Sequence, residues 1–380
     1  MRKPVLFRVT NNLNIGGVQR RIRSVLPLLT DTFDVHVVTY KDKGIFWEEL
    51  PHHGVQTHFV PLNGKWDMGG IRRMAALFRQ CGTDIVHTHS LGGNISGILA
   101  AALAKVPVRI GQVHHRGVHW YARSPLHRWK QKAEETLIHR LFTDKVLHVS
   151  QESLDYFAQQ TGLPSGKLAV LHNGVDFNAM LPDTDPAALR ASLSIARHKT
   201  IIGFVGRLVE GKGVEFCMEF AKQCLAASDR YAFVIVGGAP EEKLRSLRKA
   251  ASGWGDGASV VFTGERKDVA NFYNLFDLYF FPSDAEWEGM PGVVLEACSF
   301  GLPVLARETA PVREISAYYP RILFMDDNTA PPAALEAALR LPAADQLAFR
   351  DRFSIEAMAE RTRALYLALL HNRAQEHPAR

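Results

Sequence analysis

Short β-branched runs alternate with amphipathic helical stretches along both halves of this chain. In the first half the strand-like runs are 5–10, 34–39, 57–61, 84–89, 108–114, 145–150 and 168–172. In the second half they are 200–206, 232–237, 259–264, 277–281, 303–306 and 322–325. Such alternation is typical of parallel βαβ units, in which a helix after each strand covers the sheet. The sequence therefore predicts an α/β protein built of doubly wound parallel sheets.

The length of the chain, 380 residues, favours two domains over one compact core. Segment 181–186 contains two prolines and has no apolar period, so we expect it to link the domains. The expected bounds are 1–182 for the N-terminal domain and 183–354 for the C-terminal domain. Two Rossmann-like domains joined there would face each other across a central cleft at the carboxyl ends of their strands.

Composition argues against a membrane span and against a structural metal. No window approaches the roughly 18 uninterrupted apolar residues that a span needs, and the start of the chain does not resemble a signal peptide. The four cysteines have neither a CxxC pair nor the spacing of zinc ligands. Two of them, Cys217 and Cys224, are two helical turns apart and should pack as small apolar groups. We expect a cytoplasmic protein.

Basic residues are concentrated in the first half. Residues 1–182 hold 22 Lys and Arg against 13 Asp and Glu, a balance of +9, whereas the whole chain carries +6. This asymmetry predicts an anionic partner, such as phospholipid head groups, a lipid-phosphate substrate or nucleic acid. No recognised nucleic-acid-binding motif is present, so we expect no nucleic acid.

Segment 115–140 interleaves basic side chains with Trp120, Tyr121 and Trp129. Basic residues beside interfacial aromatics suit an anionic membrane surface or an anionic lipid acceptor, and a solvated helix face is the alternative. The candidate acceptor or membrane ligands are Arg116, Arg123, Arg128, Lys130 and Lys132.

The segment 283–301 carries the most specific chemical signal. It places Glu288 and Glu296 eight residues apart, across a Gly-Met-Pro-Gly turn that opens a helix. A turn of this kind exposes backbone N–H groups at the positive end of a helix, where a phosphate binds readily. The flanking carboxylates suit hydroxyl groups. Phosphate together with a polyol is the outline of a nucleotide sugar.

A second loop, 206–213, follows a strand and nearly matches the P-loop pattern G-x-x-x-x-G-K-[ST]. Gly213 stands where an NTPase needs a hydroxyl to hold Mg²⁺. Arg207 and Lys212 could still neutralise a diphosphate without a metal ion. An ordinary βα turn with surface charges is the alternative.

Other polar motifs are less specific. Gly16 and Gly17 sit between the first strand and the first helix, where backbone can approach a ligand closely. His87 and His89 end one strand, and we expect alternating residues of that strand to point to opposite faces, which disfavours a zinc pair. His114 ends another strand, as a polar group of the cleft or as simple packing. The D-x-D segment 183–185 is best explained as a solvated linker.

Taken together, the two glutamates, Arg207 and Lys212, and the segment Asn173-Gly-Val-Asp176 resemble the retaining GT-B glycosyltransferases of family four (glycosyl transferases group 1). The resemblance runs from the first strand to the final helix. It implies that Glu296 accepts hydrogen bonds from the ribose hydroxyls and that Glu288 lies at the donor sugar. It also implies that a helix at about 355–372 packs back onto the N-terminal, acceptor-binding domain.

The resemblance assigns catalytic roles to Glu288, His114, Arg207 and Lys212. The donor-binding residues that it implies, besides Arg207 and Lys212, are Gly16, Gly17, Gly264, Arg266, Gly289, Met290, Pro291, Gly292, Val293 and Glu296. No metal or other cofactor is expected. Same-face attack, with the leaving phosphate taking the acceptor's proton, fits a retaining outcome, and double displacement through Glu288 is the alternative.

The expected function is transfer of a sugar from a nucleotide-diphosphate sugar to a glycan or lipid-linked acceptor in cell-surface polysaccharide or lipopolysaccharide biosynthesis. The protein would then act in the cytoplasm or peripherally on the inner face of the membrane. Three alternatives stay open: a P-loop NTPase, a sugar-nucleotide epimerase of the same fold, and a non-catalytic sugar-nucleotide-binding module.

Overall fold

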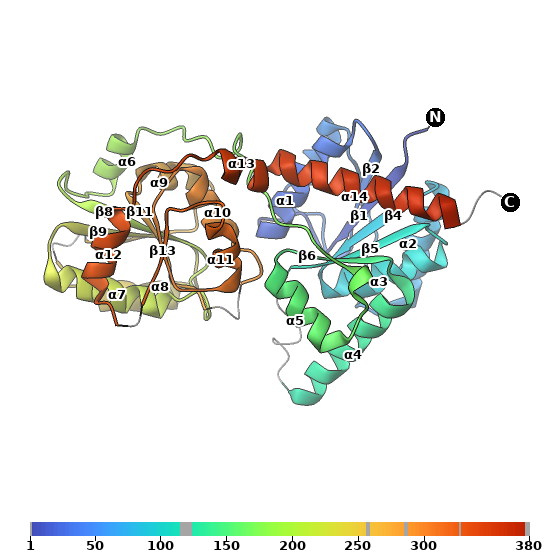
Figure 1. Cartoon of the computed structure of the whole chain (residues 1–380), viewed down its shortest axis with the longest axis horizontal. Coiled ribbons are helices and arrows are strands. Elements are labelled where there is room, and N and C mark those ends of the chain that lie inside the picture. The colour runs from blue at the N-terminus through green and yellow to red at the C-terminus, as the bar shows by residue number, and fades with distance from the viewer. Residues whose placement is uncertain (1, 115–123, 256–258, 285–287, 327, 377–380) are drawn as a thin grey trace. The chain divides into compact units, whose positions relative to one another are not determined.

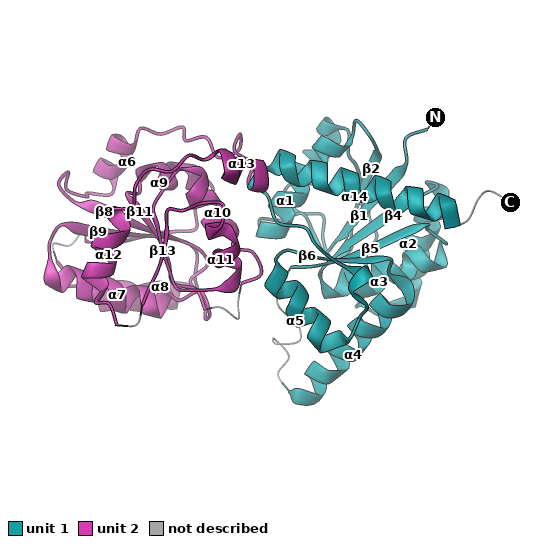
Figure 2. Ribbon diagram, in the orientation of Figure 1, with its two compact units in different colours: residues 1–174, 353–380 teal, residues 175–352 magenta. Residues whose placement is uncertain are grey.

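The computed structural model (Figure 1) describes residues 2–114, 124–255, 259–284, 288–326 and 328–376. The chain forms two compact units (Figure 2). Unit 1 comprises residues 1–174 and 353–380, and unit 2 comprises residues 175–352. Each unit contains one parallel sheet, so the prediction of two doubly wound α/β domains is confirmed.

The sheet of unit 1 has the strand order β3-β2-β1-β4-β5-β6-β7. Its strands are β1 (Val5–Thr10), β2 (Asp34–Thr39), β3 (Gln56–Phe59), β4 (Ile85–His89), β5 (Val108–Val113), β6 (Lys145–His148) and β7 (Leu168–Val170). Its helices are α1 (Gly17–Val25), α2 (Met68–Gln80), α3 (Ser90–Leu103), α4 (Pro125–Phe142), α5 (Gln151–Thr161) and α14 (Ile355–Glu376). The order reverses between β1 and β4, which makes that edge the topological switch point.

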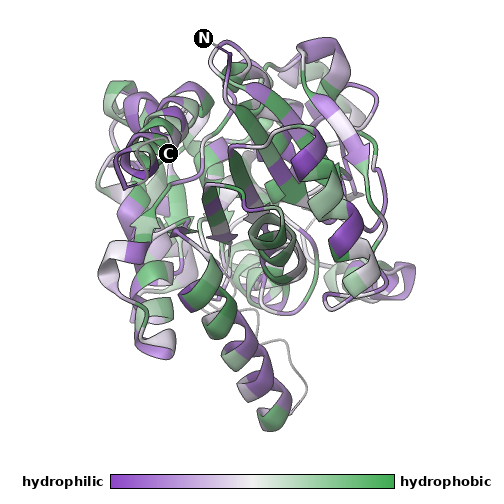
Figure 3. Ribbon diagram, turned by 90° about the vertical axis from the view of Figure 1, so that its right-hand side faces the viewer, coloured by the Kyte–Doolittle hydropathy of each residue, from purple (hydrophilic) through white to green (hydrophobic). Residues whose placement is uncertain are grey.

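The central strands of unit 1 are buried on both faces. Along β1, Leu6 packs in a cluster with α1 and α14, whereas Phe7 packs in a cluster with α2 and α3. Continuous burial of this kind explains why the strand reads as an apolar run rather than as an alternating pattern. In Figure 3 these strands are largely hydrophobic, and α14 follows the sequence of unit 2 yet contributes Met358 and Tyr366 to the unit 1 core.

The sheet of unit 2 has the order β10-β9-β8-β11-β12-β13. Its strands are β8 (Thr200–Val205), β9 (Tyr231–Val236), β10 (Val260–Gly264), β11 (Leu278–Phe281), β12 (Val304–Ala306) and β13 (Ile322–Phe324). Its helices are α6 (Pro186–Ser192), α7 (Val214–Ala227), α8 (Glu241–Ala251), α9 (Val269–Leu275), α10 (Gly292–Ser299), α11 (Ala310–Ser316), α12 (Pro331–Leu339) and α13 (Leu347–Phe353). The switch point lies between β8 and β11.

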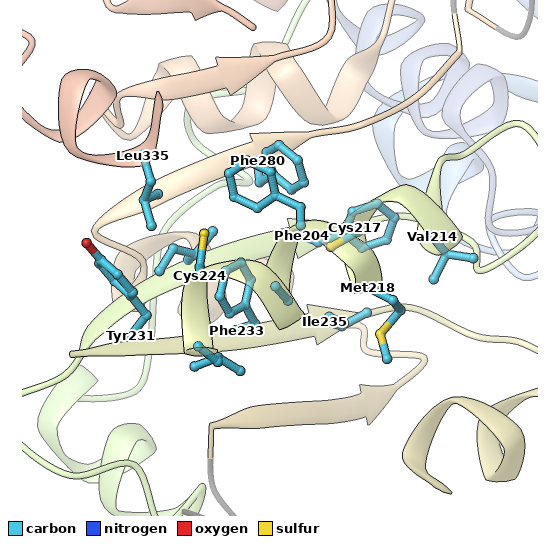
Figure 4. Packing of buried hydrophobic residues seen from close by; sticks show 14 of the residues in the cluster. Phe204, Val214, Cys217, Met218, Cys224, Tyr231, Phe233, Ile235, Phe280 and Leu335 are labelled. Atoms are coloured by element: carbon cyan, nitrogen blue, oxygen red, sulfur yellow. The ribbon is translucent and has the colours of Figure 1, made fainter. Parts of the chain in front are cut away.

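Aliphatic, aromatic and sulfur-containing side chains together fill the core of unit 2 (Figure 4). The rings of Phe220 and Phe280 are 4.4 Å apart and nearly parallel. Cys217 and Cys224 are both buried beside them on α7, and burial raises the pKa of each thiol to about 12. They pack as small apolar groups, as predicted.

The segment expected to be the linker belongs to unit 2. The chain enters unit 2 after Gly174, and Asn271 then holds the segment in place. Asn271 Oδ1 accepts hydrogen bonds from the backbone N–H groups of Asp183 and Thr184, at 2.9 and 3.1 Å. Asp185 caps the N-terminus of α6. Asp183 Oδ1 accepts a hydrogen bond from Asn271 Nδ2 at 2.8 Å, so both carboxylates of the segment have structural partners. In the described part of the chain, no helix has the length and apolarity that crossing a membrane requires.

Candidate functional site

The switch point of unit 2 brings two predicted loops together. Loop 206–213 follows β8, and the loop after β11 leads to α10; because β8 and β11 are neighbours, both loops leave the same sheet edge. The backbone N–H of Asp284 donates to Gly211 O at 3.0 Å. Gly213, the N-cap of α7, has φ of +70°, and an added Cβ would lie 2.1 Å from Pro282 O. Close packing of the two loops therefore requires a glycine where a P-loop would carry a hydroxyl.

The two loops place a cation against a buried carboxylate. Lys212 Nζ lies 2.7 Å from Glu288 Oε1, and Glu288 is only 6% exposed. A buried carboxylate needs such a partner, because desolvation otherwise disfavours its charge. Arg307, which follows β12, pairs with Asp284 and donates to Pro282 O, so it holds the residues directly after β11. The sequence predicted Lys212 and Glu288 but gave no signal for Arg307.

Helix α10 begins beside this pair. Gly292 is its first residue, and none of the described side chains caps it at Pro291. Gly289 and Met290 are buried, as is Pro291, while Gly292 and Val293 are half-buried. A helix N-terminus without an acidic cap carries a positive potential that suits an anion.

Glu296 lies in the second turn of α10. Its Oε2 accepts a hydrogen bond from Tyr273 OH at 3.0 Å. The pKa of the buried phenol of Tyr279 is raised well above the usual value, first by burial and then by the charges of Glu296 and Glu288. Both glutamates thus lie within electrostatic range of one side chain, so the structure gathers the two predicted acceptors in unit 2.

The remaining predicted donor residues of unit 2 lie at or just after the ends of β8 and β10. Arg207 is exposed, and Arg266 is engaged by both carboxylate oxygens of Asp268, at 2.8 and 2.7 Å. Gly264 ends β10 with φ of +74°, and its carbonyl accepts from the N–H of Gly237 at 2.9 Å. Gly237 was missed by the sequence analysis, although a Gly-Gly pair directly after an apolar run at 232–236 marks such a strand end.

In unit 1, Gly16 and Gly17 lie at the N-terminus of α1, where no described side chain provides a cap. Gly16 has φ of −179°, which any residue can adopt, so its backbone does not require glycine. At the neighbouring strand end, Ser90 adopts φ of +66°, which is uncommon outside glycine. Such a residue at a switch point suggests a functional constraint, and the sequence gave no sign of it.

The prediction that His87 and His89 face opposite sides of the sheet is wrong. Residues two apart on a strand share a face, and the two rings stack with centroids 4.7 Å apart. His89 Nδ1 lies 2.8 Å from His114 Nε2, so His114 joins the same row. Burial, followed by the charge of Arg8, holds the pKa of His87 and His89 well below the usual value. Neither this row nor any other group of three or more His, Cys, Asp or Glu side chains among the described residues is arranged so that it could hold a metal ion.

The predicted acceptor or membrane ligands divide into three groups. Arg116 and Arg123 lie outside the described residues. Arg128 and Lys130 are exposed on α4. Lys132 is half-buried and donates to Gln160 Oε1 at 2.9 Å, so it ties α4 to α5 instead of facing outward.

Helix α4 also exposes an apolar stripe that the sequence analysis missed. Four of its side chains, at a spacing close to one helical turn or its multiples, are more than half exposed: Leu126, Trp129, Leu137 and Leu141. Hydrophobic and hydrophilic residues alternate along this helix, which reaches the bottom of Figure 3. Four exposed apolar side chains on one helix indicate a surface that contacts a membrane, another protein or a ligand.

Comparisons with known proteins agree with the geometry. A family model described as Glycosyltransferase Family 4 matches residues 15–179, and one described as Glycosyl transferases group 1 matches residues 199–342. The chain is 27% identical to the Escherichia coli UDP-Gal:alpha-D-GlcNAc-diphosphoundecaprenol alpha-1,3-galactosyltransferase, over 77% of this chain and 76% of that protein. It is 28% identical to a GDP-mannose-dependent alpha-mannosyltransferase of Corynebacterium glutamicum, over 77% of this chain and 69% of that protein.

Among solved structures, Anabaena HepE in complex with UDP-glucose superimposes with a TM-score of 0.71. The alignment covers 98% of both chains at 18% sequence identity. At this level of identity, the likeness shows that the two proteins share a fold.

Proposed function

The chain belongs to the GT-B glycosyltransferases of family four, and from this premise we propose that it transfers a sugar from a UDP- or GDP-sugar to a lipid-linked acceptor. The product would be part of a cell-surface polysaccharide or lipopolysaccharide. The observation that carries the proposal is the contact between Lys212 and Glu288 beside the N-terminus of α10. The NTPase and epimerase alternatives gain no support from the family matches.

Glycosyl transfer needs stabilisation of the negative charge that develops on the leaving diphosphate. We assign this role to Lys212, Arg207 and the N–H groups that open α10, which supply positive charge without a metal ion. We also assign a catalytic role to His114, whose Nε2 lies 2.8 Å from His89 Nδ1. Glu288 is bound by an ammonium group, which weakens it as a nucleophile. We therefore favour same-face attack, in which the leaving phosphate takes the acceptor's proton, over double displacement.

The donor class can be identified by thermal shift in the presence of EDTA. We expect one class among UDP-, GDP-, ADP- and dTDP-sugars to raise the Tm of the wild type by about 5 to 10 °C at a hundredfold excess over Kd. The variant Glu296→Ala should lose this shift, because the ribose hydroxyls lose their acceptor. Glu219→Ala, which removes an exposed glutamate of α7, is the matched control and should keep it. In a parallel assay without EDTA, stabilisation by ATP with Mg²⁺ and by none of the nucleotide sugars would favour the NTPase alternative.

We also propose that α4 places the enzyme on an anionic membrane surface, where a lipid-linked acceptor is found. The exposed stripe of Leu126, Trp129, Leu137 and Leu141 would enter the interface, with Arg128 and Lys130 at the head groups. The helix is firmly anchored at its C-terminus. Lys167 Nζ donates to the carbonyl oxygens of His139, Arg140 and Thr143, at 2.8 to 3.1 Å.

This membrane proposal is tested with the double variant Arg128→Glu, Lys130→Glu. Each basic residue near an anionic surface contributes about 1 kcal/mol, so reversing two should lower partitioning onto phosphatidylglycerol vesicles by at least about 30-fold. The matched control is Arg245→Glu, Lys249→Glu, which reverses two exposed charges one turn apart on α8. Equal binding of both variants in vesicle co-sedimentation at low salt would refute the role of α4.

A further inference from the structure

A buried tyrosine of unit 2 contacts the glutamate to which we assign the ribose hydroxyls. Tyr273 lies on α9 and is fully buried. Its hydroxyl is 3.0 Å from Glu296 Oε2 and 3.2 Å from the carbonyl oxygen of Val293. Both acceptors belong to α10, so a single phenol links the first turn of that helix to the carboxylate in its second turn.

The ring of Tyr273 is held on several sides by aromatic neighbours. Phe300 stacks on it with ring centroids 5.7 Å apart and an interplanar angle of 23°. Phe276 meets it edge-on at 5.9 Å, and Tyr279 lies at 5.8 Å. Packing at this density leaves a side chain in one rotamer, and the position of a phenol hydroxyl is set by its ring. The hydroxyl therefore stands at a fixed point next to Glu296.

A glutamate carboxylate has about four acceptor positions on its two oxygens, and rotation of the side chain changes their directions. A hydrogen bond from a fixed donor to one oxygen removes much of this rotation. Such preorganisation strengthens binding, because the cost of ordering the side chain has been met before the ligand arrives. A vicinal diol needs two acceptor positions in a defined geometry, so it gains most from a carboxylate held in this way.

We propose that Tyr273 is a positioning residue that orients Glu296 to accept the ribose diol of the nucleotide donor. The inference rests on the proposed function, since it presupposes that a nucleotide binds beside α10. It adds a residue outside the motif 288–296, from a helix that precedes β11 in the sequence. The inference also predicts that the Tyr273 hydroxyl strengthens binding of the ribose and has no effect on binding of the diphosphate.

The test compares Tyr273→Phe with Tyr279→Phe. Both variants lose a fully buried hydroxyl from the same aromatic cluster, but Tyr279 OH donates to the backbone carbonyl of Val205, at 3.2 Å. Calorimetry would give the Kd of UDP and GDP and of their 2′,3′-dideoxy forms, which lack both ribose hydroxyls. For Tyr273→Phe we expect about 5- to 10-fold weaker binding of the ribonucleotide that the wild type binds.

The dideoxy form should bind Tyr273→Phe within about twofold of the wild type, and Tyr279→Phe should bind both forms within about twofold. The double variant Tyr273→Phe, Glu296→Ala should bind no more weakly than Glu296→Ala alone, because the tyrosine acts through the glutamate. Equal weakening of both nucleotide forms would show a merely structural role and overturn the inference, as would unchanged binding.

Two other results of these binding measurements test the donor site itself and not only the role of Tyr273. Equal affinity of the wild type and of Glu296→Ala for the ribonucleotide would refute the ribose role of that glutamate. A wild type that binds neither UDP nor GDP would refute the donor site, and the role of Tyr273 would be refuted with it.

Discussion

Replacing Lys212 with alanine is expected to lower kcat/KM for sugar transfer by about 10²- to 10³-fold, the usual cost of removing one preorganised group that stabilises developing charge. Lys212 is placed for this role by its contact with Glu288 Oε1, 2.7 Å away. The same change leaves a carboxylate that is only 6% exposed without its ammonium partner, so the free energy of unfolding should fall by about 1–3 kcal/mol. Steady-state kinetics and urea unfolding measure the two effects.

The control for this variant is Lys243→Ala. Lys243 Nζ lies 2.8 Å from Glu215 Oε1, so an ion pair of nearly the same length is lost in the same unit, but at a site where the carboxylate is exposed. We expect this variant to keep full activity and to lose about 0–1 kcal/mol of stability. Glu288→Gln combined with Lys212→Ala should cost much less activity than the sum of the two single losses, because the two side chains act together. Equal kinetics for Lys212→Ala and Lys243→Ala would contradict the assigned role.

The contact between Lys212 and Glu288 shows how far the sequence could predict the site. The apolar runs 200–206 and 277–281 identified two strand ends, and the charged residues after them suggested a diphosphate site. The neighbouring positions of these ends depend on strand order, because β8 lies next to β11 although β9 and β10 intervene in the sequence. Periodicity identifies strands but does not order them, so the grouping of Lys212 and Glu288 in one site came from family resemblance, and their contact was not predicted.

Other parts of the structure depend on side-chain contacts that hydrophobic periodicity in the sequence does not predict. Tyr273 and Arg307 read as a core aromatic and a surface charge, and their contacts follow from how α9 and the end of β12 are rotated. The stacking of His87 on His89 could have been predicted, since residues two apart share a face of a strand; the error was in applying the alternation. The expected linker at 181–186 was misjudged because an asparagine far along the chain, Asn271, binds its backbone.

Acidification from pH 7 to pH 5 is expected to destabilise the protein mainly through the buried histidines of unit 1. Burial, followed by the proximity of His139, lowers the pKa of His148 from 6.5 to about 3, and the pKa values of His87 and His89 are also lowered well below 6.5. Between the unfolded and folded pKa values the unfolded chain binds a proton that the native chain does not. Stability is therefore lost as the pH falls below 6.5.

His148 alone should lower the free energy of unfolding by about 2 kcal/mol at pH 5, because 1.5 pH units below 6.5 correspond to about 1.36 kcal/mol each. The native carboxylates do not confound this window, since their unfolded pKa values lie lower. Urea unfolding at both pH values should show the His148→Gln variant losing about 2 kcal/mol less than the wild type. His198→Gln, at an exposed histidine of unit 2, should leave the loss unchanged. The same pH dependence in all three proteins would mean that His148 does not stay neutral in the native chain, and that the acid sensitivity has another source.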